Sequence, residues 1–154
     1  MSNTPNQKRR RAERARDFLE VLIDRHPGAL SRERDHVRPL AIGIQEALRA
    51  DLDTDDELAE TPNWLLKQAL ARYTHSPAYL EAIIAGHRRI GLDGGDAGAV
   101  TEEAVAHARA RRDEQKARAA ERRRQTRKSR KRENGQHNVQ ERKLQRLADK
   151  FNSR

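Results

Sequence analysis

The sequence predicts a mostly helical α+β domain with one small β-hairpin, flanked by basic tails that are disordered or frayed. Apolar residues recur at three- and four-residue spacing in several stretches of the middle of the chain, which is the periodicity of amphipathic helices. Both ends are rich in Arg and Lys and poor in apolar residues, so they cannot bury enough surface to fold alone. We therefore expect a disordered arm over 1–16, one domain over 17–112, and a basic extension over 113–154 whose end has the pattern of a short helix.

Five stretches carry both a boundary signal and the apolar face of a helix. The first starts at about Ala12 and is stopped by His26-Pro27-Gly28. The other four begin at a proline or at a hydroxyl residue suited to capping the free N–H groups of a first turn. Their expected starts are Pro39, Thr61-Pro62, Ser76-Pro77 and Thr101.

Two further features complete the expected fold. Residues 89–92 and 97–100 flank a Gly-rich turn at 93–96, and this arrangement is typical of a β-hairpin. Beyond Arg109 the chain has no apolar face and is expected to be either a cationic helical rod or a frayed chain, which Asn134-Gly135 breaks. A last amphipathic helix is then predicted, with its apolar side formed by Val139, Leu144, Leu147 and Phe151.

The net charge of +9 is distributed unevenly along the chain. Residues 1–17 carry +4, residues 18–108 carry −7 and residues 109–154 carry +12, with His counted as neutral. The apolar residues lie mostly in the acidic middle part, so the domain that they form is not itself a cationic protein. A polyanionic partner must therefore be bound by the tails together with a local patch on the domain.

Several functional classes lack the residues that they need. The chain has no Cys, which excludes disulfides, thiolate zinc sites and cysteine nucleophiles, and which fits a cytoplasmic protein. No apolar run approaches the roughly 20 residues of a membrane span, and we expect no secretory signal. The motifs of phosphate-binding loops, serine hydrolases and zinc proteases are absent. We expect no enzymatic activity, no metal or cofactor, and no membrane or small-molecule partner.

The strongest candidate for a binding site is the junction between two expected helices at Tyr73-Thr74-His75-Ser76. The N–H groups at the start of the second helix, together with the Thr74 and Ser76 hydroxyls, are donors suited to a phosphate or a terminal ribose. Two alternatives stay open at this point. Ser76 could serve only to cap its helix, and Tyr73 could be a core aromatic residue with its hydroxyl at the rim.

Four short motifs follow one another between Arg38 and Arg109. Each is weak alone, because Pro and Gly punctuation recurs in many proteins, but four collinear motifs make a coincidence improbable. They are Arg38-Pro39-Leu40-Ala41-Ile42-Gly43-Ile44, Tyr73 to Leu80, Leu92-Asp93-Gly94 with Gly98, Val100 and Thr101, and His107-Ala108-Arg109. In this order and at this spacing, over about residues 17–112, the sequence resembles the ProQ/FinO family of bacterial RNA chaperones.

The resemblance implies a post-transcriptional regulator that binds RNA hairpins followed by a short 3′ single strand, such as small-RNA terminators. Its partners would be small RNAs and mRNA 3′ ends, bound by a monomer on one concave face. The positions that match the family's RNA-contacting pattern are Lys67, Tyr73 and the Thr74–Ser76 junction. Nearby basic candidates are Arg38, Arg72, Arg88, Arg89 and Arg109.

The sequence departs from the family pattern at three positions of that face. Ala41 stands where Lys is common, Ala71 where a second basic residue of the helix usually lies, and Ala78 where Arg is often found. Each phosphate contact contributes about 0.7 to 0.9 to the salt slope of log affinity. The isolated domain is therefore expected to bind RNA more weakly than a typical relative.

The basic tails are expected to compensate through sequence-independent attraction to phosphates. Their candidate contacts are Lys8, Arg9, Arg10 and Arg11 in the first tail, and Arg122, Arg123, Arg124, Arg127 and Lys128 in the second. Two other functions stay open. One is a non-specific nucleic-acid or ribosome-associated protein that binds through its tails, and the other is a protein-interaction adaptor that docks its Val139–Phe151 helix on a partner.

Overall fold

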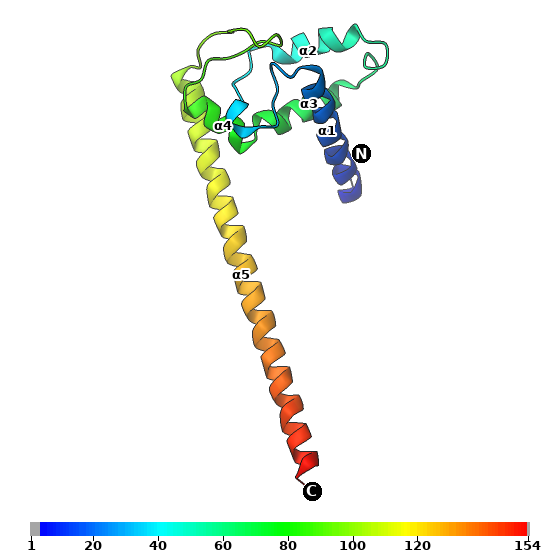
Figure 1. Ribbon diagram of the computed structural model, residues 1–154, viewed down its shortest axis with the longest axis vertical. Helices are drawn as coiled ribbons and strands as arrows, with labels where there is room; N and C mark the ends of the chain where they lie inside the picture. The colour runs from blue at the N-terminus through cyan, green and yellow to red at the C-terminus, as the bar shows by residue number, and fades with distance from the viewer. Residues whose placement is uncertain (1–3, 154) are drawn as a thin grey trace. The chain divides into compact units, whose positions relative to one another are not determined.

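The computed structural model describes residues 4–153, and the elements found there are helical. They follow the chain in the colour order of Figure 1. Their bounds are α1 (Pro5–Arg25), the 3-10 helix η1 (Arg34–His36), α2 (Ile44–Asp53), α3 (Asn63–Thr74), α4 (Pro77–Ile84) and α5 (Glu102–Asn152). The chain divides into two units, residues 1–112 and 113–154, so that α5 contributes to both.

The core of the first unit is built mainly from leucine. Leu22 of α1, Leu48 and Leu52 of α2 and Leu66 of α3 are each at most 1% exposed. α1 packs chiefly against α3, whose buried side chains face it. Each fully buried leucine contributes roughly 1.5–3 kcal/mol through removal of its side chain from water. The predicted apolar faces of α1 and α3 are confirmed by this core.

α1 begins at Pro5, well before the predicted start near Ala12. Thr4 caps the helix: its hydroxyl accepts a bond from the Gln7 N–H, while the Gln7 side chain accepts one from the Thr4 N–H. This reciprocal pair satisfies two N–H groups that a helix start leaves free. The prediction that the chain begins with a disordered or frayed tail is therefore wrong for residues 4–16, and residues 1–3 lie outside the described part.

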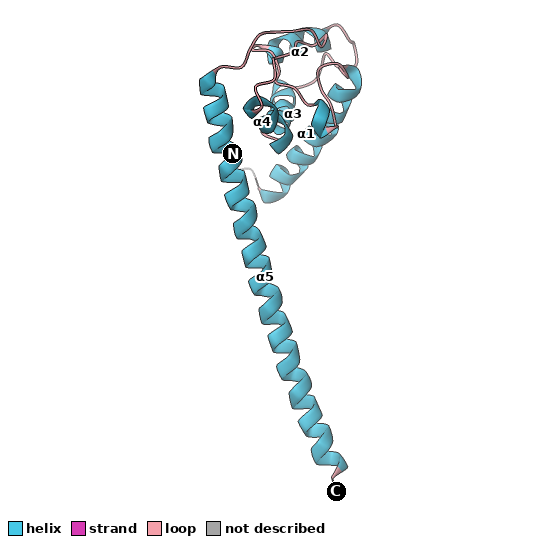
Figure 2. Cartoon of the chain, turned by 60° about the vertical axis from the view of Figure 1, so that its left-hand side comes forward, coloured by secondary structure: helices cyan, strands magenta, loops and turns pink. Residues whose placement is uncertain are grey.

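The predicted β-hairpin is wrong, because no strand forms within residues 4–153, as the colouring of Figure 2 shows. Ile90 makes only isolated bridges, one to Leu40 and one to Asp96. The carboxylates of Asp93 and Asp96 accept bonds from the N–H groups of Gly95 and Gly98, respectively. Backbone bonds also join the two stretches, from the Arg89 N–H to the Gly98 carbonyl and from the Ala97 N–H to the Arg89 carbonyl, both at 2.7 Å. This pairing is limited to isolated bridges and does not extend into a strand. The domain is thus helical rather than α+β.

α5 runs through Asn134 and Gly135 without the predicted break. A glycine inside a helix costs about 1 kcal/mol relative to alanine. The flanking Arg, Lys and Glu residues are strong helix formers, so this single glycine does not end the helix. Pairs at four-residue spacing, such as Glu114 with Arg118, add to this stability. The prediction of a frayed or disordered second tail is therefore wrong for residues 113–152. In the second unit, Leu144 and Phe151 are exposed on this helix.

Candidate nucleic-acid interface

The junction between α3 and α4 uses its hydroxyl groups internally. Ser76 caps α4: its hydroxyl donates to the Tyr73 carbonyl over 2.7 Å and accepts from the Tyr79 N–H over 3.3 Å. The Thr74 hydroxyl donates to the Leu70 carbonyl over 3.0 Å. Neither hydroxyl proton is therefore available to a phosphate in this arrangement. In the first turn of α4, the N–H of Ala78 is the donor without an acceptor among the described residues.

Tyr73 lies in the core, with only 5% of its surface exposed. Its hydroxyl oxygen accepts a bond from the Ser31 N–H over 3.2 Å, and its ring meets that of Tyr79 edge to face at 5.7 Å. The Tyr79 hydroxyl in turn accepts from the Leu40 N–H over 2.9 Å. Burial raises the pKa of Tyr73 above its ordinary value. Tyr73 therefore fixes the backbone beneath the junction, as its core alternative requires.

A groove of about 370 Å³ lies between α2 and α3. Three of the predicted contacts line it: Lys67, Thr74 and His75. Lys67 is exposed, and its side chain has no hydrogen bond or ion pair within the described residues. Glu46 lines the opposite wall, and its charge opposes an anion there. The α2–α3 groove therefore offers one cation beside the junction, not a cationic cluster.

Three of the predicted basic candidates hold loops in place. Arg38 donates from Nη1 to the carbonyls of Asp35 and Val37, at 2.8 and 2.9 Å. Arg89 donates from Nη1 to the Leu40 carbonyl at 2.9 Å, across the two loops. Arg88 forms an ion pair of 2.7 Å with the Asp96 carboxylate. Arg109 borders a different groove, lined by Gly86, Ala99, Val100, Glu102, Val105 and Ala106. The structure therefore does not gather these four with Lys67.

A charge cluster at Glu81 joins three elements of the first unit. Arg34 and Arg112 both donate to the Glu81 carboxylate, and the Arg112 Nη2–Oε1 distance is 3.0 Å. The hydrogen bond from Arg34, followed by that from Arg112, lowers the pKa of Glu81 below its ordinary value. The cluster fixes the start of α5 against α4 within residues 1–112.

Arg72 faces a second groove, between α1 and α3, with a volume of about 430 Å³. Lys8 and Arg11 lie on its α1 side, so two residues predicted in a disordered arm are brought to the domain surface. The early start of α1 places them there. The sequence signal was available, since Thr4 and Gln7 have the spacing of a capping box. The other lining residues of this α1–α3 groove are Ala12, Ala15, Gln68 and Ala71.

Trp64 is a residue of this surface that the sequence did not single out. Two guanidinium groups lie over its ring, with the Cζ of Arg11 at 4.6 Å and that of Arg14 at 5.1 Å from the ring centre. Such cation–π contacts contribute roughly 0.5–1 kcal/mol at exposed sites. They hold both arginines in place next to the α1–α3 groove.

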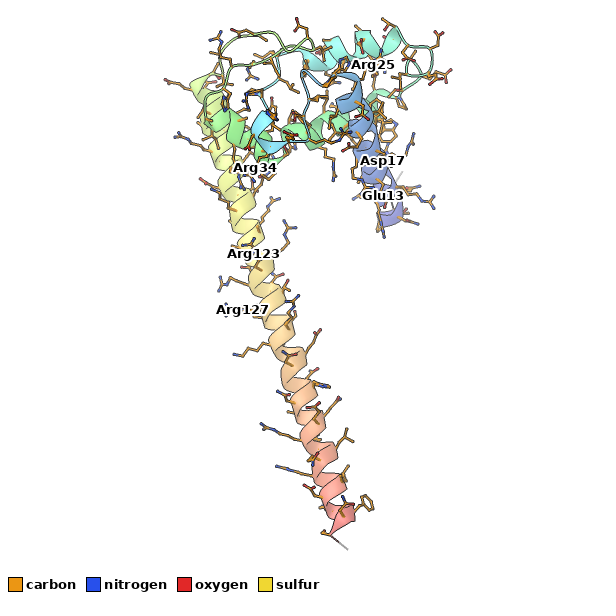
Figure 3. All side chains as sticks on the ribbon, viewed as in Figure 1. Glu13, Asp17, Arg25, Arg34, Arg123 and Arg127 are labelled. Carbon is orange, nitrogen blue, oxygen red and sulfur yellow. The ribbon has the colours of Figure 1, made fainter. Side chains whose placement is uncertain are left out.

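The predicted basic contacts of the second tail are exposed on α5. In Figure 3, Arg123 and Arg127 project sideways from the helix. Arg122, Arg123 and Arg127 lie together along the helix with Thr126 and Arg130. This stretch of the second unit is a cationic helical surface without a core of its own.

Residues 4–153 hold neither a cluster of metal-binding side chains nor a helix that could span a membrane. No group of three or more His, Cys, Asp or Glu side chains in this part of the chain is arranged to bind a metal ion. This part also has no helix that is both long and apolar enough to cross a membrane.

The α1–α3 groove with Lys8, Arg11 and Arg72, and the α2–α3 groove with Lys67, are chemically suited to bind an anion. The chain is a member of the ProQ/FINO family, whose profile matches residues 12–125. It is 36% identical over 116 residues to the RNA chaperone ProQ of Idiomarina loihiensis, and this match covers 75% of this chain and 54% of the relative. It is 37% identical over 109 residues to the RNA chaperone ProQ of Alteromonas mediterranea, covering 71% of this chain and 47% of that one.

The chain therefore spans about half the length of these curated relatives. Among solved structures, the solution structure of a ProQ homolog from Legionella pneumophila is similar, with a TM-score of 0.56 and 29% sequence identity. That likeness covers 65% of this chain and 81% of the Legionella chain. The fold of the first unit is thus shared with a ProQ homolog.

Proposed function

We propose that this protein is an RNA chaperone that binds a structured RNA at a hairpin followed by a 3′ single strand. Its targets would be small RNAs and mRNA 3′ ends, and it would act without covalent chemistry. The observation that carries the proposal is the α2–α3 groove, where Lys67 lies with Thr74 and His75 at the C-terminal end of α3. Family membership supports RNA as the ligand, since the relatives named above are RNA chaperones.

The charges and hydrogen-bonding groups of the α2–α3 groove suit the 3′ end of an RNA strand. Lys67 attracts a phosphate from the side of α3. The N-terminus of α4 begins just after His75, so the positive end of its helix dipole adds to the attraction of an anion at the end of the groove. The Thr74 hydroxyl donates its hydrogen bond to the Leu70 carbonyl, so its oxygen can accept a bond from a terminal ribose hydroxyl. A free 3′ hydroxyl would be bound better than a 3′ phosphate, whose extra charge meets Glu46.

The exposed cations of α5 would add affinity without selectivity. Residues 109–132 carry thirteen basic and three acidic groups. Cations on a helix without an apolar face attract phosphates by counterion release, which does not depend on RNA sequence. By lowering the repulsion between two RNA strands, the same charges would favour their pairing.

The test is binding of a terminator-like hairpin with a short U-rich tail, carrying either a 3′ hydroxyl or a 3′ phosphate, in excess duplex DNA. We expect the full chain to prefer the 3′ hydroxyl and Lys67→Ala to weaken binding several-fold. Arg16→Ala, which removes one exposed charge from α1 outside both grooves, is the matched control. Equal binding of the two RNAs, with competition by DNA, would instead identify a non-specific polyanion-binding protein.

A further inference from the structure

We propose that the α1–α3 groove is a second RNA phosphate site, which extends the path of the RNA backbone from the α2–α3 groove. This inference rests on the function proposed above. It concerns Lys8, Arg11 and Arg72, which two separate helices bring to one groove.

The charge of the α1–α3 groove has a single sign. Lys8, Arg11 and Arg72 are its charged lining residues, and the others are Gln68 and three alanines. None of the three cations forms an ion pair or a side-chain hydrogen bond within residues 4–153. Several other arginines of the first unit differ: Arg25, Arg32, Arg34, Arg49 and Arg88 are each paired with a carboxylate. A groove lined by unpaired cations and apolar walls concentrates its field on an incoming anion.

Arg11 is already held in a binding position. Its guanidinium Cζ lies over the Trp64 ring, 4.6 Å from the ring centre, and the residue is only partly exposed. A cation–π contact uses no N–H hydrogen bond, so the N–H groups of Arg11 stay available to a phosphate, which accepts two parallel bonds from such a fork. Because the side chain is ordered before binding, less conformational entropy is lost on contact.

Ala71 connects the two grooves. It lines the α2–α3 groove together with Lys67, and it lines the α1–α3 groove together with Arg72. An alanine has no side chain long enough to separate them, so a strand bound at Lys67 can cross α3 at this point. The cation missing at Ala71 is thereby replaced by Arg72, one position further, and by the two cations of α1.

The α1 side of this site lies outside the part of the chain that the family profile matches. Lys8 and Arg11 precede residue 12, where the match to the family profile begins. They are helical because Thr4, Pro5 and Gln7 start α1 ahead of them. The first turns of α1 therefore have an identifiable role: they carry two cations to the surface of α3.

The experiment measures the salt dependence of hairpin RNA binding by the full chain and by the Lys8→Ala/Arg72→Ala double variant. Loss of two phosphate contacts should lower the slope of log affinity against log salt by about 1.4 to 1.8, and weaken binding by more than about tenfold at 0.1 M salt. Each single variant should lose about half of the slope change. Arg16→Ala is again the control, and unchanged thermal unfolding verifies the fold, since the replaced side chains are exposed.

Outcomes separate the two proposals. A preference for the 3′ hydroxyl that survives in the double variant, together with the reduced slope, supports a second phosphate site. Retained preference with an unchanged slope overturns the α1–α3 site and leaves the proposed function intact. If the wild-type chain shows no preference for hairpin RNA over DNA, the proposed function fails, whatever the slope of the variant.

Discussion

The two units of the chain are helical for different physical reasons. Residues 1–112 form helices because their apolar faces bury one another, as the nearly complete burial of Leu22, Leu48 and Leu66 shows. Residues 113–153 have no such core, and their helix depends on residue propensity and on pairs such as Glu114 with Arg118. The comparison teaches that one chain can combine two kinds of helix. Side-chain packing holds the grooves of the first unit in shape, while helix propensity and such side-chain pairs keep the charged residues of the second unit on an extended helix.

The two units also treat their cations differently. In the first unit most arginines are tied to carboxylates or carbonyl groups, whereas Lys8, Arg11 and Arg72, which form no ion pair among the described residues, line one groove. In the second unit the cations are exposed along one helix, with Arg122, Arg123 and Arg127 close together. Selectivity is therefore expected from the first unit and general attraction from the second.

The largest expected effect is on the packed unit. Leu66→Ala leaves a cavity in the core, and we expect a loss of about 2–5 kcal/mol in the free energy of unfolding. Denaturant unfolding followed by fluorescence measures this directly, because Trp64 is the single tryptophan and lies in the first unit. The matched control, Leu144→Ala, removes an exposed side chain and should change stability by less than about 0.5 kcal/mol. Similar losses in both variants would contradict the comparison.

A proline in the second unit should break the helix without unfolding the domain. Ala120→Pro removes a helical hydrogen bond and costs about 3 kcal/mol locally, so the circular dichroism at 222 nm should fall. The unfolding midpoint reported by Trp64 should not change. A lower midpoint would show that helix α5 beyond residue 112 stabilises the first unit.

A smaller effect is expected on the acid stability of the first unit. The folded-state pKa of Glu81 is lowered, so its pairs with Arg34 and Arg112 contribute stability above the unfolded pKa of about 4.3. That contribution is lost as the pH falls through the folded pKa. Because Glu81 is 37% exposed, Glu81→Gln should cost no more than about 1 kcal/mol at pH 7.

Urea unfolding at pH 7 and at pH 3 checks this sign. The stability difference between the wild type and Glu81→Gln should narrow at the lower pH. Glu114→Gln, in the second unit, should leave the Trp64-reported stability unchanged at both. A difference for Glu81→Gln that is equal at the two pH values would show that its charge is not the cause.

Much of the helical fold could be predicted from the sequence, because periodic apolar residues and Ser/Thr-Pro helix starts depend on neighbours in the sequence. The prediction failed where hydrogen bonds between distant parts of the chain determine the backbone structure. Ile90 bonds to the Pro39 and Ala41 backbone, and the backbone bonds across the turn are limited to residues 89–91 and 95–98, so the expected strands do not form. The early start of α1 was predictable from Thr4 and Gln7, but the basic composition of the arm obscured it.

The candidate site was predicted in part. The grouping of Lys67 with Thr74 and His75 followed from the motif, and the structure brings them to one groove. The burial of Tyr73 was one of the two alternatives that the sequence left open. The loop bonds of Arg38 and Arg89 were not predictable, because a residue's type does not reveal which backbone carbonyl lies within its reach. The α1–α3 groove needed the packing of two helices that are distant in sequence.

The most direct measurement of the central claim is the mapping of backbone amide shifts by NMR during titration of the full chain with a 3′-hydroxyl hairpin RNA. The account predicts that the largest shifts cluster at Lys67, Thr74–Ser76 and Ala78, with weaker, salt-sensitive shifts along residues 113–153. Shifts confined to residues 113–153, with the first unit unaffected, would contradict it and assign all RNA binding to the cationic helix.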